Sequence, residues 1–457
     1  MTKIAFTGAG SSVFAKNILG DCMLSEPLQD AHIALYDVNR VRLEESRKML
    51  ENLNKNINKG RATITAHLGR GQRRAALKGA NYVVNAIQVG GYEPSTVVDF
   101  EIPKKYGLRQ TIADTLGIGG IFRTLRTAPV VLDFARDMEA VCPDAWFLNY
   151  TNPMCTVTGA VLHGSSIRSV GLCHSVQVCA PGLLRRVEME DEVADLQWKI
   201  AGINHQAWLL EITDGGRDLY PEIKKRAAKL NRQARKKGAE KHGDMVRLEM
   251  MRHFDYYITE SSEHSAEYMP YWIKGAYPEL IEEFNIPLDE YPRRCVRQIE
   301  RWAERSADLV ANKKLTHQRT HEYGSYIMEA METDQPYRIG GNVLNDGLIT
   351  NLPEKAVVEV ACLVDRNGVQ GTYVGNLPEQ LAALNRTNIN VHLMSLEAVF
   401  GRRRESVYQA AMLDPHTAAE LSLDDIRSMC DDMIAAHGMA DYFKKSKGYA
   451  LPKVWLG

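Results

Sequence analysis

The chain has 457 residues, of which 45% are hydrophobic and 25% are charged, a balance typical of a globular protein with a large core. The formal net charge is −1, so no global field favours nucleic acid, an acidic membrane surface or an acidic substrate. The length indicates two or three domains. The sequence contains no uninterrupted apolar run of about 18 residues, so we expect no transmembrane helix.

The eight cysteines are scattered without a CxxC pair, and Lys3 is followed at once by a strand-like run rather than by a signal peptide. In a chain of this length the pattern predicts free thiols in a reducing compartment. We therefore expect a cytoplasmic protein.

Strand and helix signals alternate through the first part of the chain. Helical periodicity at 12–24 and 38–57 separates short apolar runs. These runs are expected to be strands at 3–10, 32–37, 81–91, 145–153 and 167–174. The alternation predicts a doubly wound parallel sheet of the Rossmann type over about residues 1–195.

The second part, residues 196–457, has a different pattern that predicts a mixed α+β domain. Strands are expected within 195–212 and at 357–365, and helical periodicity dominates 378–413 and 421–437. The basic run at 224–242 is predicted to be an exposed helix or loop rather than a nucleic-acid contact, because acidic residues balance it elsewhere.

The stretch "GAGSSVF" follows the first expected strand and opens the first expected helix. Gly8 and Gly10 would let the backbone approach a pyrophosphate, which the helix N-terminus would bind. Val13 replaces the third glycine, so the motif is degenerate. Asp37 ends the second expected strand, where an acid favours NAD over NADP. The alternative is the same fold with another nucleotide or none.

"GLCHSV" sets Cys173 and His174 at the end of another expected strand, the usual place for ligands in an open α/β sheet. His205 ends a further short apolar run. A thiolate and an imidazole from two strand ends could hold one divalent ion. The pair lacks the spacing of a zinc motif, and a buried cysteine can simply fill space.

Two segments are rich in groups for acid–base chemistry. The stretch 255–268 holds three tyrosines, several acids and a histidine, and it could equally be a solvated helix face. The stretch 111–126 combines Asp114 with glycines and arginines, which is typical of a loop closing over a polar ligand or of a plain glycine-rich connector.

Together these motifs resemble glycoside hydrolase family 4, the NAD-dependent glycosidases that depart from the two-carboxylate scheme. The resemblance runs through almost the whole chain. It is carried by "FTGAGSSVFAKNILGD", "LNYTNP", "GLCHSV", "AGINH", "TESSEH", "PLDEYPRRC" and "LAALNRTNIN". The letters "CHSV" are similar to those of the bacterial α-galactosidase (melibiase) group. The last residues, 437–457, depart from the tail that this group leads us to expect.

The resemblance implies a lactate/malate dehydrogenase-like fold, a sugar substrate, NAD and a divalent metal, usually manganese. In that chemistry C3 of the sugar is oxidised transiently and the metal polarises the ketone. A base then removes the C2 proton, the leaving group is eliminated from C1, and water adds, giving hydrolysis with retention. The family also implies a homodimer or homotetramer, without a nucleic-acid or membrane partner.

The resemblance also implies roles for individual residues. Cys173 and His205 are the expected metal ligands, and Asn152, Asn149 and Arg293 the expected substrate contacts. Tyr256 is the first choice for the C2 base and Tyr257 the second. The other acid–base candidates are His174, Glu260, Glu263 and Asp114. The expected NAD contacts are Gly8, Gly10, Ser11, Asp37, Asn85, Gln88 and Asn149.

Three alternatives stay open from the sequence. An α-glucosidase or an α-galacturonidase would share the motifs, and the second could use Arg293 or Arg294 for a uronate carboxylate. A 2-hydroxy-acid dehydrogenase would use the same fold without a metal. A non-catalytic NAD sensor would bind the dinucleotide without turnover.

Overall fold

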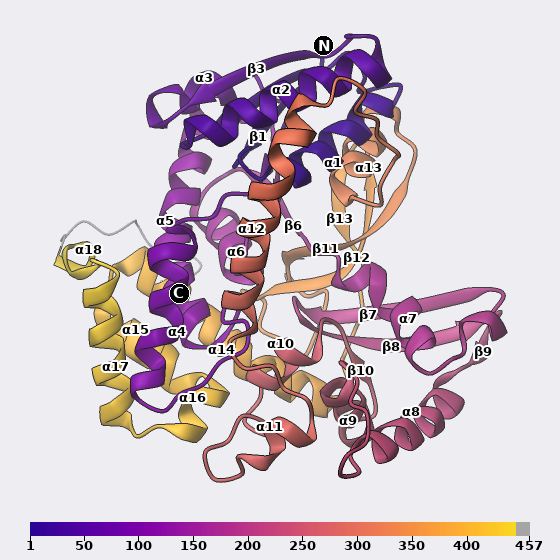
Figure 1. Ribbon diagram of the computed structural model, residues 1–457, viewed down its shortest axis with the longest axis vertical. Helices are drawn as coiled ribbons and strands as arrows, with labels where there is room; N and C mark the ends of the chain where they lie inside the picture. The colour runs from indigo at the N-terminus through magenta and orange to yellow at the C-terminus, as the bar shows by residue number, and fades with distance from the viewer. Residues whose placement is uncertain (445–457) are drawn as a thin grey trace.

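The computed structural model describes residues 1–444. Its N-terminal half, drawn in indigo to purple in Figure 1, contains six parallel strands. Their order is β3-β2-β1-β4-β5-β6, which is the strand order of dinucleotide-binding domains. This confirms the predicted Rossmann-type doubly wound sheet. The strands are β1 (Lys3–Thr7), β2 (His32–Asp37), β3 (Thr63–Leu68), β4 (Tyr82–Asn85), β5 (Trp146–Asn149) and β6 (Arg168–Leu172).

The strands other than β3 are largely buried on both faces of this sheet because they are mostly apolar on both sides. On β1, Ile4 and Phe6 belong to a core cluster with residues of α1 (Ser12–Leu24) and α2 (Arg40–Asn58). Ala5 points to the other cluster, which includes residues of α5 (Gly117–Val141). Continuous apolar strands of this kind are typical of parallel sheets covered by helices on two sides.

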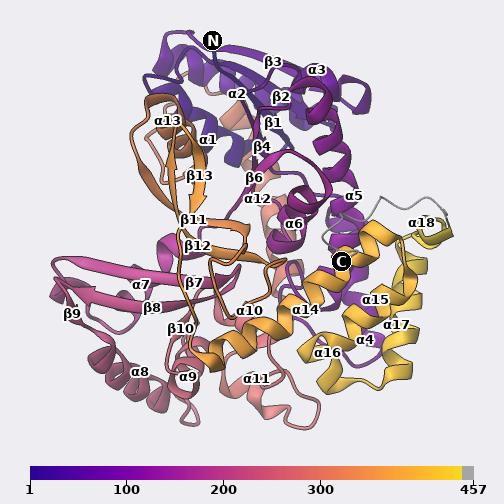
Figure 2. The ribbon, with the colours of Figure 1, turned by 180° about the vertical axis from the view of Figure 1, so that it is seen from behind.

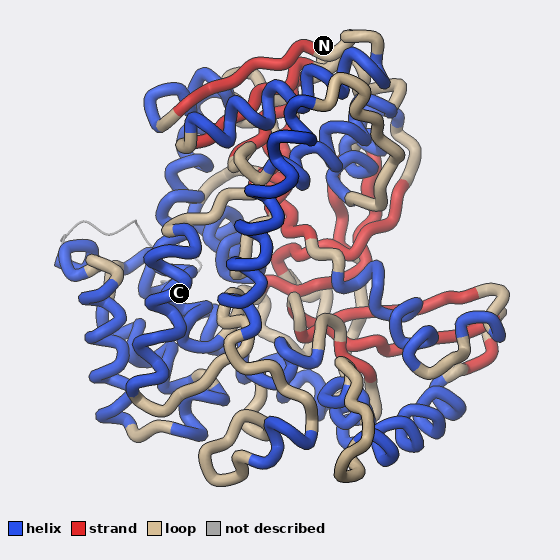
Figure 3. The backbone as a smooth tube through the Cα atoms, viewed as in Figure 1, coloured by secondary structure: helices blue, strands red, loops and turns tan. Residues whose placement is uncertain are grey.

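The same sheet continues into the second half of the chain with antiparallel strands. After β6 the order is β11, β12, β7, β8 and β10, while β13 pairs with β12 and β9 pairs with β8. Figure 3 shows these strands running on from the parallel part. The division at residue 195 therefore stays a prediction. The strands are β7 (Leu196–Ile203), β8 (Gln206–Asp214), β9 (Arg217–Asp218), β10 (Tyr257–Ile258), β11 (Tyr337–Leu344), β12 (Val357–Asp365) and β13 (Gly368–Gly371).

Most of the remaining helices pack around this second half, while α12 and α13 also contact helices of the first half. A helical layer at the C-terminal end packs against α5 and appears yellow in Figure 2, with α14 as its long diagonal member. The basic run begins on α8, where Arg226 pairs with Glu192 and Glu222. The helices outside the parallel part are α7 (Ser175–Arg186), α8 (Tyr220–Ala234), α9 (Met245–Phe254), α10 (Ser262–Glu267), α11 (Glu279–Glu283), α12 (Glu290–Ala311), α13 (Tyr323–Thr333), α14 (Glu379–Gly401), α15 (Arg404–Leu413), α16 (Pro415–Glu420), α17 (Leu423–Ala436) and α18 (Ala440–Lys444).

Helix α12 connects the two halves of the molecule. It runs in front of the sheet in Figure 1, from the C-terminal half up to α2. There the guanidinium of Arg42 lies 5.6 Å from the centre of the Trp302 ring, and Asn52 donates a hydrogen bond to the carbonyl of Val310. Its N-terminal end, at Tyr291, reaches the cavity described below.

Within residues 1–444, none of the helices has the length and apolar character needed to cross a membrane. All eight cysteines are free, as predicted; seven are buried, and Cys173 is partly exposed. The expected deviation at 437–457 falls mostly on residues 445–457, which lie outside the described part of the chain.

Candidate active site

Three potential metal ligands meet where strands of the two halves end. Cys173 follows β6, His205 stands in the tight turn between β7 and β8, and Glu260 follows β10. One ligand atom from each lies within 4.8 Å of the other two. His205 and Glu260 have φ values of 62° and 66°. Left-handed backbone at residues other than glycine is uncommon and is concentrated at functional sites.

The electrostatics of this cluster fit a divalent cation. Nε2 of His205 lies 3.4 Å from Oε2 of Glu260. Burial lowers the pKa of His205, but Glu260 and Cys173 outweigh burial and raise it to about 10. For Glu260 the directions are reversed. Burial raises the pKa of its carboxyl group, but the positive charges of His205, His264 and Arg247 outweigh burial and bring this pKa below its usual value. A thiol, an imidazole and a carboxylate are a ligand set for a transition metal, with positions left open for a substrate.

His264 links this cluster to Asp114. Its Nε2 lies 3.7 Å from Asp114, its Nδ1 lies 3.6 Å from Glu260, and its ring stands edge-on to His205 at 4.8 Å. Burial raises the pKa of Asp114, but His264 and Arg123 hold it well below its usual range. Asp114 is therefore an ionised, buried carboxylate beside the candidate metal ligands.

A cavity of about 300 Å³ connects the cluster with the glycine-rich loop of the first half. Ser11 and Gln88 line it on the side of the parallel strands, and Asp114, Cys173 and His174 line it on the side of the cluster. Asn152 also lines it, and its buried Oδ1 has no hydrogen-bond partner within the described chain. An unsatisfied buried acceptor next to a cavity is a place where a ligand hydroxyl can donate a hydrogen bond.

The glycine-rich loop has the backbone that dinucleotide binding requires. Gly8 has a φ of 82°, and a Cβ there would lie 2.5 Å from the carbonyl oxygen of Ala86. Ser11 directly precedes α1, so the free amides of that helix point to the cavity end of the loop. The carboxylate of Asp37 accepts hydrogen bonds of 2.7 Å from the amides of Gly10 and Asn39. Asp37 thus fixes the loop and lies at the end of β2, where a ribose would bind.

Asn85 and Asn149 lie one layer below the cavity. Both side chains are fully buried, and Nδ2 of Asn85 donates a 2.9 Å hydrogen bond to Oδ1 of Asn149. Asn149 in turn donates to Thr158 and to the carbonyl of Thr151. The two amides connect the ends of β4 and β5, and neither residue is among those that line the cavity; their predicted contacts with NAD and the substrate stay predictions.

His174 stands in the cavity wall and pairs with Glu322, which precedes α13. Its Nε2 lies 2.7 Å from Oε2 of Glu322. The hydrogen bond to Glu322 raises the pKa of His174 above its ordinary value, and burial only partly opposes it. An imidazolium here could donate a proton into the cavity.

Four of the predicted acid–base and substrate residues belong neither to the lining of this cavity nor to the metal cluster: Tyr256, Tyr257, Glu263 and Arg293. Tyr256 lines a separate cavity beside β8, and the hydroxyl of Tyr257 donates a 2.5 Å hydrogen bond to Asp244. Glu263 pairs with Arg294 at 2.7 Å. Arg293 is exposed and pairs with Glu290 at 3.0 Å.

The stretch 111–126 was expected to be a loop closing over a polar ligand or a glycine-rich connector, and this expectation is wrong for residues 117–126. They form the first turns of α5. A Cβ on Gly119 would lie 2.6 Å from the carbonyl oxygen of Ala113, so this glycine allows the helix to pack against the preceding segment. The glycines here serve a close approach of backbone rather than flexibility.

The structure adds groups that the sequence reasoning did not assign. The hydroxyl oxygen of Tyr268 lies 3.0 Å from Nδ1 of His205. In the cavity lining, Nη1 of Arg123 donates a 3.3 Å hydrogen bond to the hydroxyl oxygen of Tyr291. Tyr268 and Tyr291 belong to motifs that the sequence had singled out. Glu322 belongs to none: it lies at the start of α13, and β11, which follows that helix, pairs with β6 just before His174.

Known proteins share this architecture and sequence. Residues 3–189 match the model of family 4 glycosyl hydrolases, and residues 200–417 match the model of their C-terminal domain. An α-galactosidase of Bacillus subtilis (strain 168) is 62% identical over 438 residues, which cover 96% of this chain and 98% of that protein.

Solved structures agree with this similarity. The crystal structure of lplD from Bacillus subtilis superposes with a TM-score of 0.83 at 25% identity, covering 95% of this chain and 99% of that one. A 6-phospho-α-glucosidase from gut microorganisms, solved in complex with NAD and Mn²⁺, has a TM-score of 0.74 at 20% identity and covers 96% of this chain and 98% of its own. At that identity the second likeness concerns the fold.

Proposed function

The chain belongs to glycoside hydrolase family 4 and is a glycosidase, and we propose that it is an α-galactosidase that hydrolyses terminal α-galactosides of the melibiose and raffinose type with retention. The observation that carries the proposal is that the candidate dinucleotide loop and the candidate metal cluster line the same cavity. The dinucleotide loop at Ser11 lines one side, and Cys173 of the candidate metal cluster lines the other. The 62% identical α-galactosidase supports the choice of sugar.

We propose NAD and Mn²⁺ as the cofactors. Gly8, Gly10, Ser11 and Asp37 would hold the dinucleotide, and Cys173, His205 and Glu260 would hold the cation. When bound, the nicotinamide supplies a reversible hydride acceptor for C3 of the sugar, and the cation supplies Lewis-acid polarisation of the oxygen there. Asn152, with its unsatisfied Oδ1, would accept a hydrogen bond from a sugar hydroxyl.

His174 is the proposed proton donor to the leaving oxygen. It lines the cavity next to Cys173, and Glu322 keeps its imidazole protonated at higher pH than an isolated histidine. A positioned acid of this kind assists the departure of a poor leaving group, such as a sugar hydroxyl.

For the base at C2 we propose Tyr268 in place of Tyr256. The resemblance implies a tyrosine after the metal histidine, and the hydroxyl of Tyr268 contacts His205 directly at 3.0 Å. Burial and the charges of Asp114 and Glu267 raise the pKa of Tyr268 well above its ordinary value. Its phenol is therefore protonated in the chain alone, and a positive charge at the neighbouring cluster would be needed to make it a base.

The test is hydrolysis of p-nitrophenyl α-galactoside with NAD⁺, Mn²⁺ and a thiol reductant. We expect hydrolysis that depends on both cofactors and produces no net NADH. The matched p-nitrophenyl α-glucoside and α-galacturonide should be cleaved more slowly, and faster cleavage of either would reassign the sugar. Net NADH formation from lactate or malate, without cleavage of any glycoside, would overturn the proposal.

A further inference from the structure

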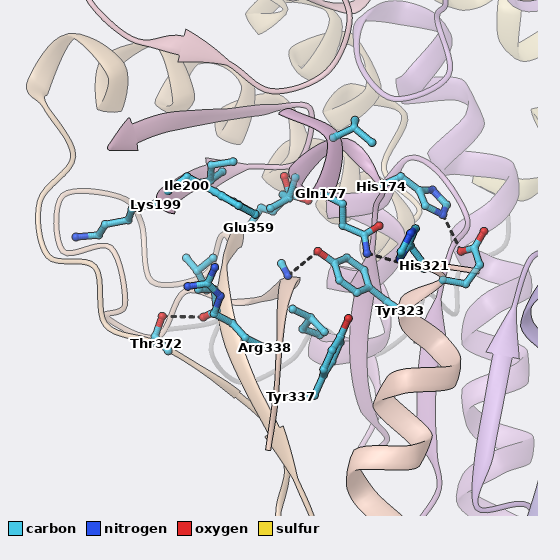
Figure 4. Close-up of a pocket in the computed structure, with 18 residues that line it drawn as sticks. His174, Gln177, Lys199, Ile200, His321, Tyr323, Tyr337, Arg338, Glu359 and Thr372 are labelled. Atoms are coloured by element: carbon cyan, nitrogen blue, oxygen red, sulfur yellow. Dashed lines mark hydrogen bonds and ion pairs between the residues drawn. The ribbon is translucent and has the colours of Figure 1, made fainter. Parts of the chain in front are cut away.

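A second and larger cavity lies beyond His174. Its volume is about 890 Å³, and His174 lines both this cavity and the smaller one at the metal cluster. Figure 4 shows His174 and His321 at one end of the larger cavity and Lys199 and Thr372 at the opposite end. The sequence motifs and the chemistry proposed above use none of the residues at its far end.

The larger cavity is lined by three neighbouring strands of the sheet, β7, β12 and β11. Trp198, Lys199 and Ile200 on β7 form one wall, while Tyr337 and Arg338 at the start of β11 face it from the other. The guanidinium of Arg338 lies 5.8 Å from the centre of the Trp198 ring, which links the two walls. The two strands do not pair with each other, because β12 separates them in the sheet.

The lining combines aromatic rings with polar groups. Trp198 and Tyr337 are partly exposed, and Gln177, Lys199 and Arg338 offer hydrogen-bond donors. Glu359 also lines the cavity and is fully buried, and its Oε2 has no hydrogen-bond partner in the part of the chain described. Flat apolar surface together with a few placed polar groups is the composition expected of a small-molecule site.

We propose that this cavity is the subsite for the leaving group and takes a glucosyl unit or a longer saccharide joined through the α-galactosidic bond. The inference rests on the proposed function. The reacting galactosyl unit would occupy the cavity of about 300 Å³, which the nicotinamide end of the cofactor must share. The remaining sugars need space on the other side of the glycosidic bond. The larger cavity offers this space, because His174 lines both cavities.

The competing occupant is a second copy of the chain, because partly exposed aromatic residues also occur at subunit interfaces. The lining itself favours a saccharide. The buried carboxyl oxygen of Glu359 is unsatisfied, and a sugar hydroxyl could satisfy it. The experiment separates the two occupants.

The experiment compares raffinose, which carries two sugars beyond the bond, with α-galactosyl fluoride, which carries none. The variants are Arg338→Ala, which removes an exposed side chain, and Trp198→Ala. We expect each to lower the ratio of kcat/KM for raffinose to kcat/KM for the fluoride by about tenfold, the size of one or two lost sugar contacts. Tyr277→Ala is the matched control, since Tyr277 is exposed and does not line this cavity, and it should leave the ratio unchanged.

An unchanged ratio in Arg338→Ala and Trp198→Ala would overturn the inference while wild-type cleavage of the fluoride upholds the proposed function. Equal losses on both substrates, accompanied by a smaller sedimentation coefficient, would assign the cavity to a second copy and likewise overturn it. If the wild-type enzyme cleaves neither substrate, the proposed function fails first and the inference fails with it.

Discussion

Nε2 of His174 lies 2.7 Å from Oε2 of Glu322, and the two residues come from distant parts of the chain, one after β6 and the other before α13. The pairing of β11 with β6 brings them together. Glu322 favours the protonated imidazole at the wall between the two cavities. The contact therefore couples the parallel sheet to the second half of the chain at the point proposed for proton donation.

If His174 donates that proton, its loss should matter most for poor leaving groups. We expect His174→Gln to lower kcat/KM for methyl α-galactoside about a hundredfold or more, the usual contribution of a general acid. The loss with p-nitrophenyl α-galactoside should be much smaller, because nitrophenolate departs without protonation. Glu322→Gln should show the same pattern in weaker form. Equal losses on both substrates in His174→Gln would show that the residue has another role.

The assignment of Tyr268 predicts a specific loss of proton transfer at C2. Tyr268→Phe should abolish deuterium incorporation at C2 of galactose products formed in D₂O, because the phenol that contacts His205 is missing. Affinity for NAD, measured by titration, should stay within about twofold, since Tyr268 does not touch the glycine-rich loop. Tyr256→Phe is the matched control. If that control stops C2 exchange while Tyr268→Phe does not, the base is Tyr256, as the sequence had indicated.

His392 on α14 predicts a pH dependence of stability. It is buried, its Nε2 has no partner among residues 1–444, and burial lowers its pKa to about 4. Between pH ~6.5 and ~4 the unfolded chain binds a proton that the folded chain rejects, so the free energy of unfolding should fall by up to about 3 kcal/mol as pH decreases across that window.

Denaturant unfolding at several pH values measures this effect. His392→Gln should reduce the slope of the unfolding free energy against pH between about 4 and 6.5 by nearly one proton. Ser395→Ala, on the same helix, removes no titratable group and should leave the slope unchanged. Identical slopes in the wild type and His392→Gln would show that His392 is protonated in the folded protein.

The fold of the first half was predictable because local patterns determine it. Apolar runs alternate with amphipathic helices, and Gly8 and Asp37 lie at the ends of β1 and β2, where the proposed dinucleotide would bind. The juxtaposition of Cys173 and His205 was predictable for a related reason, since each ends or interrupts a strand. Residues at the carboxyl ends of strands in one sheet tend to lie at the same edge.

The rest of the site depends on long-range pairing that no local pattern encodes. Tyr256 and Tyr257 follow His205 in the sequence, but α9 and the short β10 turn both away from the cavity, and Tyr268 on the far side of α10 contacts His205 instead. Arg293 has the residue type for a carboxylate, yet its partner is Glu290 one turn away on α12. Arg123, in the apparent loop that proved to be α5, is the arginine that lines the cavity.

The most direct test of the proposed metal site is Mn²⁺ binding measured by electron paramagnetic resonance, with the wild type and Cys173→Ser each titrated in the presence of a thiol reductant. We expect one bound Mn²⁺ per wild-type chain and an affinity at least about tenfold weaker in Cys173→Ser. NAD affinity should be preserved in the variant, which shows that the Rossmann-type half is folded. Equal Mn²⁺ affinity in the two proteins would contradict the assignment of Cys173, His205 and Glu260 as the metal site.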